Sequence, residues 1–478
     1  MNKIPLLWTL SLALALALTL LGCGATTSAP LSAGNVNLIF VVSQDLAYHA
    51  LGDIDPSTAN LTSQGLQRSL RMGAFLKQSV LGGNNVTRTH ALEPMTHPQT
   101  ANNYPDMAAL QAVQQFAMLN QISLPTGSNS PVVGNSFPIY ASYAGFVPAG
   151  VAPPVLPCAI CQGLDFNDTN DANEALVGGI ILANVPGFYV FSAPWETVSA
   201  LMANISQLKG YNLALPGAYA GPNYVYAISI APSGVASLAT YNSNLNPPST
   251  YPVLPSPPLT SAGCSMQTPF SISVTGGNGA TIPAGINTNE TVYIVRHADA
   301  HPISTWDDGN FIGTGQWRAL ALPNALKGKI NPTLVYAVDP AVGLPALSGN
   351  AASSYVRPAM TVLPYAIANN LPYNLAASVP FLAQNAPQLA TYASDFFFTG
   401  GKFSNQSILL GWESAHIPIT VSALLVSYGS SQTVPNWPDD DYDTIWTVRL
   451  DAQGNLTVDN AMCEGISSVD LPVTPPQF

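Results

Sequence analysis

The segment TVYIVRHADAHP, residues 291–302, joins a short apolar run directly to two cationic side chains, Arg296 and His297. A continuous apolar run of this length is typical of a strand buried on both faces, as in a parallel sheet. The pair is unexpected, because the chain of 478 residues has only 13 Lys plus Arg and 6 His. A second segment, NLIFVVSQDLAYHA at 37–50, has a similar run but continues with serine and glutamine. The two segments therefore predict related strands with different chemistry at their ends.

The chain matches itself at four further places, in the same order in both halves. These matches pair LTSQG (61–65) with FIGTG (311–315), HALEP (90–94) with YAVDP (336–340), TVSAL (197–201) with TVSAL (420–424), and YVYAISIAPSG (224–234) with TIWTVRLDAQG (444–454). At the first strand, Val42 aligns with Val295. Ordered self-similarity of this kind predicts an internal duplication, with shorter loops in the second copy.

Each copy alternates strand and helix signals. In the second copy the expected strands are 291–295, 333–338, 406–411 and 444–450, and the expected helices are 314–326, 353–369 and 417–426. Repeated strand–helix units predict an α/β fold in which helices cover both faces of a mostly parallel sheet. The expected organisation is a first domain at 36–245, a Pro/Gly-rich linker at 246–285 and a second domain at 286–478.

The first 23 residues have the features of a bacterial lipoprotein signal. A lysine precedes an apolar stretch, and LLGC at 20–23 ends in Cys23. This pattern predicts cleavage before Cys23, a lipid on its thiol and a flexible tether at 24–35. The mature protein would then be lipid-anchored in the cell envelope, on the periplasmic or cell-surface side. An ordinary secretory signal is the alternative.

Composition narrows the range of partners. Only 8% of residues are charged and the net charge is −12, with no basic run, so nucleic-acid binding is not expected. Export favours disulfides among the four remaining cysteines, and three pairings stay open. Those cysteines are Cys158, Cys161, Cys264 and Cys463.

Four cationic side chains of the second copy follow predicted strands. Arg296 and His297 end the first strand, Arg357 begins a helix after the second, and His416 follows SILLGW at 407–412. In parallel sheets, groups at the carboxyl ends of the strands meet in one crevice. Arginines there suit a phosphate dianion, and a neutral imidazole beside them can act as a nucleophile. The sequence therefore favours phosphoryl transfer.

The second copy resembles the histidine phosphatase superfamily, which has a phosphoglycerate-mutase-like three-layer α/β/α fold. The resemblance covers about 290–455 in fragments: the strand ending in Arg-His, GTGQWRALALPNAL (313–326), SSYVRPAMT (353–361) and GWESAHIP (411–418). It implies that His297 is the nucleophile of a phosphohistidine intermediate and that Arg296, Arg357 and His416 bind the phosphate. It also implies a reaction without cofactor or metal.

Two departures from the family pattern concern the loop and the proton donor. The usual glycine after Arg-His is Ala298, and no carboxylate directly follows the second histidine. Glu413 is the preferred donor, with Asp299, Asp307 and Asp308 as rivals. Trp412 and Trp306 are expected to flank the substrate.

Two neighbouring patterns receive other interpretations. His297 and His301 have the spacing of a helical zinc pair, but they follow a strand and lack the accompanying glutamate, so no metal is predicted. The acidic run PDDDYD at 438–443 is interpreted as a solvated loop near the cleft.

The first copy lacks this set of groups. Ser43 and Gln44 stand where Arg-His is expected, and Ala193 falls opposite His416. The first copy is therefore expected to fold, to pack against the second and to be inactive. The leading hypothesis for the whole chain is an exported phosphohydrolase acting on small phosphomonoesters. The alternative is a non-catalytic envelope lipoprotein that binds a ligand with a degenerate phosphatase fold.

Overall fold

The computed structural model describes residues 28–96, 99, 104–120, 122–124, 132–134, 137–141, 172–254, 267–277, 280–301, 308–341, 343–344, 353–376 and 386–478. The predicted signal, Cys23 and residues 24–27 of the tether lie outside this range, as do Cys158, Cys161 and Cys264. Cys463 is disulfide-bonded, to a partner that also lies outside the described residues. No helix among the described residues is long and apolar enough to cross a membrane.

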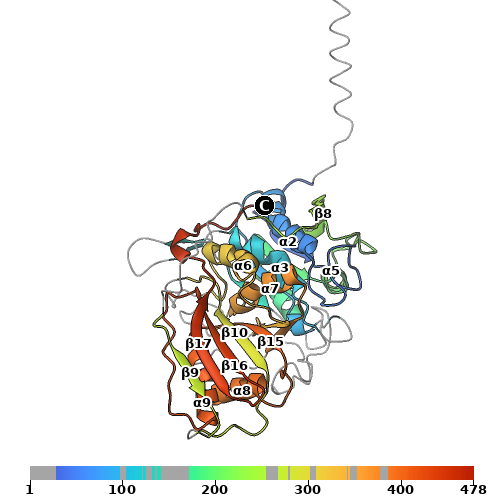
Figure 1. Cartoon of the computed structure of the whole chain (residues 1–478). Helices are drawn as coiled ribbons and strands as arrows, with labels where there is room; N and C mark the ends of the chain where they lie inside the picture. The colour runs from blue at the N-terminus through green and yellow to red at the C-terminus, as the bar shows by residue number, and fades with distance from the viewer. Residues whose placement is uncertain are drawn as a thin grey trace, which may run out of the picture.

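The chain forms an α/β structure with two mixed sheets (Figure 1). The first sheet has the order β5-β2-β6-β1-β7-β8, and the second has the order β14-β11-β15-β10-β16-β17-β9. The first contains β1 (Val36–Val42), β2 (Arg88–Ala91), β5 (Ile139–Ala141), β6 (Gly187–Ala193), β7 (Tyr224–Ile230) and β8 (Ala236–Asn242). The second contains β9 (Ser271–Val274), β10 (Glu290–Arg296), β11 (Leu334–Val338), β14 (Tyr373–Ala376), β15 (Ser407–Trp412), β16 (Thr444–Leu450) and β17 (Leu456–Cys463).

Six strands of each sheet have the same order and direction, and the second sheet adds β9 at one edge. In each, four parallel strands are followed by antiparallel strands: β1 pairs in parallel with β6 and antiparallel with β7, as β10 does with β15 and β16. Two small hairpins, β3 (Ile122–Leu124) with β4 (Val132–Gly134) and β12 (Gly343–Leu344) with β13 (Ser353–Ser354), lie outside these sheets. Identical strand order in both halves supports the predicted duplication.

The halves meet through helices. The helices of the first half are α2 (Ser63–Phe75), α3 (Ala108–Met118), α4 (Ala172–Ala183) and α5 (Trp195–Leu208), and those of the second are α6 (Gly313–Ala325), α7 (Arg357–Asn369), α8 (Ala386–Phe398) and α9 (His416–Ser427). Helix α2 contacts α7 and α3 contacts α6, so the four form a central layer (Figure 1). Because α2 corresponds to α6 and α3 to α7, these contacts are equivalent, as at a two-fold interface.

Packing at this layer makes one shared core. Val295 of β10 faces a hydrophobic cluster that includes most of the first half, whereas its neighbour Ile294 faces a second cluster with α8 and α9. Polar contacts also cross the interface: Gln114 donates to Asn310 Oδ1 (2.9 Å) and Gln316 to Gln115 Oε1 (3.2 Å). The predicted packing of the two copies is therefore observed, but their cores are not separate.

The glycine shared by LTSQG and FIGTG has a physical reason. A Cβ on Gly65 would come within 2.2 Å of the Asp53 carbonyl oxygen, and one on Gly315 within 2.5 Å of the Asp299 carbonyl oxygen. In both halves the first helix thus packs directly on the backbone that follows the first strand, which only glycine permits.

Strand pairing corrects the sequence alignment by one residue. Val42 pairs with Ala193 at the end of the first sheet, and Arg296 pairs with Trp412 in the second. The equivalents of Arg296 and His297 are therefore Val42 and Ser43, not Ser43 and Gln44.

The predicted match of Ala193 with His416 is also wrong. Pairing equates Ala193 with Trp412, and α9 begins at His416, four residues after β15 ends. In the first half α5 begins at Trp195, only two residues after β6. The longer connection that carries His416 is specific to the second half.

One domain boundary also changes. The predicted linker at 246–285 contains β9, which pairs with β17 as the edge strand of the second sheet. This part of the chain belongs to the second half.

Candidate active site

The predicted residues lie at the carboxyl edge of the second sheet, and contacts join Arg357 to His297 there. Arg296 ends β10, and the His297 N–H donates to the Trp412 carbonyl of β15 (2.7 Å). Arg357 begins α7, and its Nε donates to His297 Nε2 (3.3 Å). Strand pairing and the start of one helix thus bring two sequence-distant segments, the end of β15 and the start of α7, to His297.

Hydrogen bonds define the imidazole of His297. Its Nδ1 lies 2.8 Å from the Ala298 carbonyl oxygen, so Nδ1 carries the proton and Nε2 presents its lone pair to Arg357. The Ala298 N–H donates to Thr361 Oγ1 (2.8 Å), and the Thr361 hydroxyl donates to the Arg357 carbonyl (2.7 Å). The first turn of α7 and the His297 loop are therefore joined.

The surroundings of His297 favour its neutral form. Its side chain is almost fully buried, and burial lowers its pKa well below the ordinary value. The cations Arg357 and Arg296 lower that pKa further. A neutral imidazole with its lone pair at Nε2 is the nucleophilic form.

Arg296 is held by backbone carbonyls of the acidic run. Its Nη1 donates to the carbonyl oxygens of Pro438 (3.3 Å), Asp439 (2.6 Å) and Asp441 (3.1 Å), and its guanidinium lies 4.0 Å from the centre of the Tyr442 ring. Among the described residues its buried Nε has no hydrogen-bond partner. The run 438–443 is thus not simply a solvated loop, since Asp441 is fully buried and the loop backbone orients Arg296.

Two tyrosines flank His297. The rings of Tyr355 and Tyr442 each lie 6.0 Å from the His297 ring, and Arg357 stacks 4.6 Å over Tyr355. Tyr355 is fully buried, whereas Tyr442 is partly exposed. Sequence reasoning missed both; the adjacency of Tyr355 to Arg357 in SSYVRPAMT was the available signal.

Glu413 and Trp412 both support His416. His416 Nδ1 contacts Glu413 Oε2, which also accepts from the His416 N–H (3.0 Å), while Oε1 accepts from the Ala415 N–H (2.9 Å). Burial raises the pKa of Glu413, but the bond and charge of His416 and these N–H groups outweigh it, so the net shift is downward. Trp412 is 1% exposed and stacks on His416, with centroids 6.1 Å apart. It therefore lies behind His416 rather than beside a substrate.

The rival carboxylates have other surroundings. Asp299 binds Arg318, and Asp308 Oδ1 accepts from the Asn310 N–H (2.9 Å). Asp307 and Trp306 lie outside the described residues.

The corresponding edge of the first sheet is different. Ser43 stands at the position of His297, and within the described part of the chain its buried Oγ has no hydrogen-bond partner. Helix α3 begins with Ala108, where α7 begins with Arg357. Neither Ser43 nor Ala108, which stand at the positions of His297 and Arg357, carries a positive charge.

No group of three or more His, Cys, Asp or Glu among the described residues is arranged to hold a metal ion. No family model matches this sequence, and no significantly similar curated protein was found.

Proposed function

We propose that the second half hydrolyses phosphomonoesters through a phosphohistidine at His297, in the manner of the histidine phosphatases that its motifs resemble. The observation that carries the proposal is the buried His297, whose Nε2 lies 3.3 Å from Arg357 Nε while Arg296 precedes it in the chain. A phosphate bound between the arginines would place its phosphorus beside Nε2.

The reaction has two displacements. His297 Nε2 bonds to phosphorus while the ester phosphorus–oxygen bond breaks, and the departing oxygen takes a proton from solvent. Water then attacks phosphorus, the phosphorus–nitrogen bond breaks, and inorganic phosphate and neutral His297 are released. The arginines stabilise the charge on the phosphoryl oxygens in both steps.

The unused donor on Arg296 fits a phosphate oxygen. A buried guanidinium Nε without a partner is costly, and a bound anion would satisfy it with a charge-assisted hydrogen bond. Arg357 would turn its Nε from His297 to the phosphate, which frees the lone pair.

The contacts of Glu413 give it the role of positioning His416, whose ring would help to bind the phosphate. A carboxyl group with a lowered pKa is a poor proton donor, so the leaving group must depart with little assistance. Aryl phosphates, whose phenols have pKa values near ~10, are therefore the substrates that suit the site best. The assignment of Glu413 as donor stays a prediction.

The test is hydrolysis of an aryl phosphate by the exported domain, residues 24–478, with and without EDTA. We expect turnover that is insensitive to EDTA and an acid-labile phosphoenzyme after brief quenching with labelled substrate. Turnover without any trapped phosphohistidine, together with full activity after His297→Ala, would exclude this mechanism.

The second candidate is an exported binding protein without turnover, which the ionised Glu413 favours. It predicts that orthophosphate binds at the Arg296–Arg357 pair, measured by calorimetry, while no phosphate ester is hydrolysed. In both cases the predicted signal and Cys23 would place the protein in the cell envelope.

A further inference from the structure

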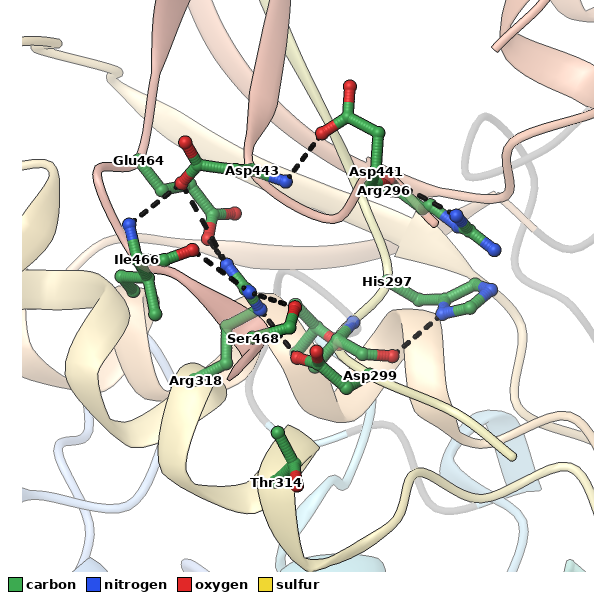
Figure 2. A network of polar contacts seen from close by, with 12 residues as sticks. Arg296, His297, Asp299, Thr314, Arg318, Asp441, Asp443, Glu464, Ile466 and Ser468 are labelled. Carbon is green, nitrogen blue, oxygen red and sulfur yellow. Dashed lines mark hydrogen bonds and ion pairs between the residues drawn. The ribbon is translucent and has the colours of Figure 1, made fainter. Parts of the chain in front are cut away.

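Arg318 of α6 is the centre of a buried ionic cluster beside the candidate active site (Figure 2). It is 0% exposed, and its Nε lies 2.5 Å from Asp299 Oδ2 and its Nη1 2.7 Å from Glu464 Oε2. Nη2 donates to the Ile466 carbonyl (3.1 Å) and to Ser468 Oγ (2.8 Å). All three guanidinium nitrogens are therefore used, in different directions.

The cluster reaches both segments that hold the reactive groups. Asp299 lies two residues after His297, in the loop whose Ala298 carbonyl fixes the His297 ring. Asp443 Oδ1 lies 4.0 Å from Arg318 Nη1 and accepts from the N–H groups of Gly465 (2.8 Å) and Ile466 (2.7 Å).

Asp443 is also connected to Arg296. It directly follows Tyr442, which stacks on Arg296, and its own N–H donates to Asp441 Oδ1 (2.9 Å). The Asp441 carbonyl in turn accepts from Arg296 (3.1 Å). Figure 2 shows Arg318 between the Asp299 loop and the 441–443 segment, with His297 and Arg296 beside them.

A lysine could not replace these contacts. Its ammonium is a single compact charge on a flexible stem, whereas the planar guanidinium donates along several fixed directions. Arg318→Lys would keep the positive charge but could not contact Asp299 and Asp443 at the same time.

The first half contains a matched arginine without a reactive site. Arg68 occupies the same position of α2, and its Nε lies 3.2 Å from Asp53 Oδ2. Its Nη1 donates to Asn223 Oδ1 and to the Leu245 carbonyl, both at 2.6 Å. A buried arginine on the first helix is thus a feature of the repeat, and Arg318 in addition binds the loop that carries His297.

We propose that Arg318 is a positioning residue, which holds the His297 loop and the 438–443 segment at the spacing that sets His297 against the two phosphate-binding arginines. The expected effect of Arg318 on turnover rests on the proposed function. Its expected effect on the position and titration of the His297 ring does not.

The experiment compares Arg318→Lys with Arg68→Lys in the otherwise intact exported domain. The readouts are NMR titration of the His297 imidazole, binding of orthophosphate in the same spectra, and kcat and KM for an aryl phosphate. Six histidines in the chain make the assignment practical. Asp299→Asn is the second variant, in case Arg318→Lys does not fold.

We expect Arg318→Lys to raise the His297 pKa toward its ordinary value, to weaken orthophosphate binding and to lower kcat by about tenfold to 100-fold, as for other supporting contacts. Arg68→Lys should leave all three unchanged, even if it lowers thermal stability. A folded Arg318→Lys or Asp299→Asn with a wild-type His297 titration would overturn the proposal, as would equal effects from Arg68→Lys. If the wild-type protein hydrolyses no phosphate ester, the proposed function fails, while the titration still decides the role of Arg318.

Discussion

The two halves share a scaffold and differ at one edge of it. Both sheets have the same strand order, both first helices carry a glycine pressed on the preceding loop, and both bury an arginine against an aspartate of that loop. At the carboxyl edge, however, Val42 and Ser43 of the first sheet occupy the positions that Arg296 and His297 occupy in the second.

This difference distinguishes the residues that both halves need for folding from those that are candidates for chemistry in the second half. The glycine and the buried ion pair are also present in the first half, where Ser43 stands at the position of His297, so they serve the fold in both halves. The arginine and histidine at the strand end are present once, and burying these polar groups costs desolvation energy that the fold does not require. Groups kept at such a cost in one copy only are the best candidates for function.

The sharpest test of the comparison is substitution at the equivalent positions His297 and Ser43. His297→Ala removes the proposed nucleophile, so kcat should fall by at least about 10³-fold, the scale seen when a catalytic nucleophile is lost. Ser43→Ala removes a buried hydroxyl without a partner among the described residues, so activity should stay within about twofold of wild type.

Steady-state hydrolysis of an aryl phosphate measures both variants, with circular dichroism to confirm folding. Activity lost equally in both variants would mean that the two edges act together, and the comparison would fail.

The next largest effect is expected for Arg357. Arg357→Lys keeps a cation but loses the fork that can bind two phosphate oxygens, so kcat/KM should fall by roughly 10²-fold. The matched change in the first half, Ala108→Lys at the start of α3, should not create activity, because Ser43 and not an imidazole stands at the position of His297. Orthophosphate affinity, measured by calorimetry, should fall in parallel for Arg357→Lys; unchanged affinity would remove Arg357 from the phosphate site.

Much of the second half follows from sequence patterns. The strands at 291–295, 333–338 and 444–450 and the helix at 314–326 were predicted within about a residue or two of β10, β11, β16 and α6. The meeting of His297 with Arg357 was also predicted, because both follow parallel strands and such strand ends share one edge.

Other features could not be read from side-chain patterns. The one-residue alignment error at the first strand arose because two valines end that run, and hydrophobicity cannot choose between them. Arg296 is held by backbone carbonyls of 438–441, which leave no residue-type signal. Trp412 was predicted to contact the substrate because its chain neighbours Glu413 and His416 were predicted to be functional, but strand alternation places it in the core with Phe397.

Glu413→Gln distinguishes a positioning role from a proton-donating role. A positioning role predicts a similar loss of kcat, about tenfold, for aryl and alkyl phosphates, because His416 is misplaced for both. A proton-donating role predicts a much larger loss for alkyl phosphates, whose leaving oxygens need the proton more. Comparing phenyl phosphate with an alkyl phosphate at several pH values measures this, and a loss confined to the alkyl ester would restore Glu413 as the donor.

The smallest expected effect concerns stability and a histidine of the first half. His90 of β2 is buried, stacks on Phe191 at 5.1 Å, and burial followed by the nearby Arg88 charge lowers its pKa to about 3. Its pKa in the unfolded chain is near ~6.5, so below that pH the unfolded state binds more protons than the folded state. Stability is therefore intact above about pH 6.5 and is lost as the pH falls from there toward 3.

Protonation of His90 in the unfolded state should therefore lower the free energy of unfolding by about 2 kcal/mol between pH 8 and pH 5. His90→Phe keeps the ring stack and cannot be protonated. Between pH 8 and pH 5 its free energy of unfolding should therefore fall by about 2 kcal/mol less than that of the wild-type protein. Denaturant unfolding at both pH values measures the difference. Because the halves share one core, the change should appear in a single transition monitored from either half; two separate transitions would mean that the halves fold independently despite the packing of α2 and α3 on α6 and α7.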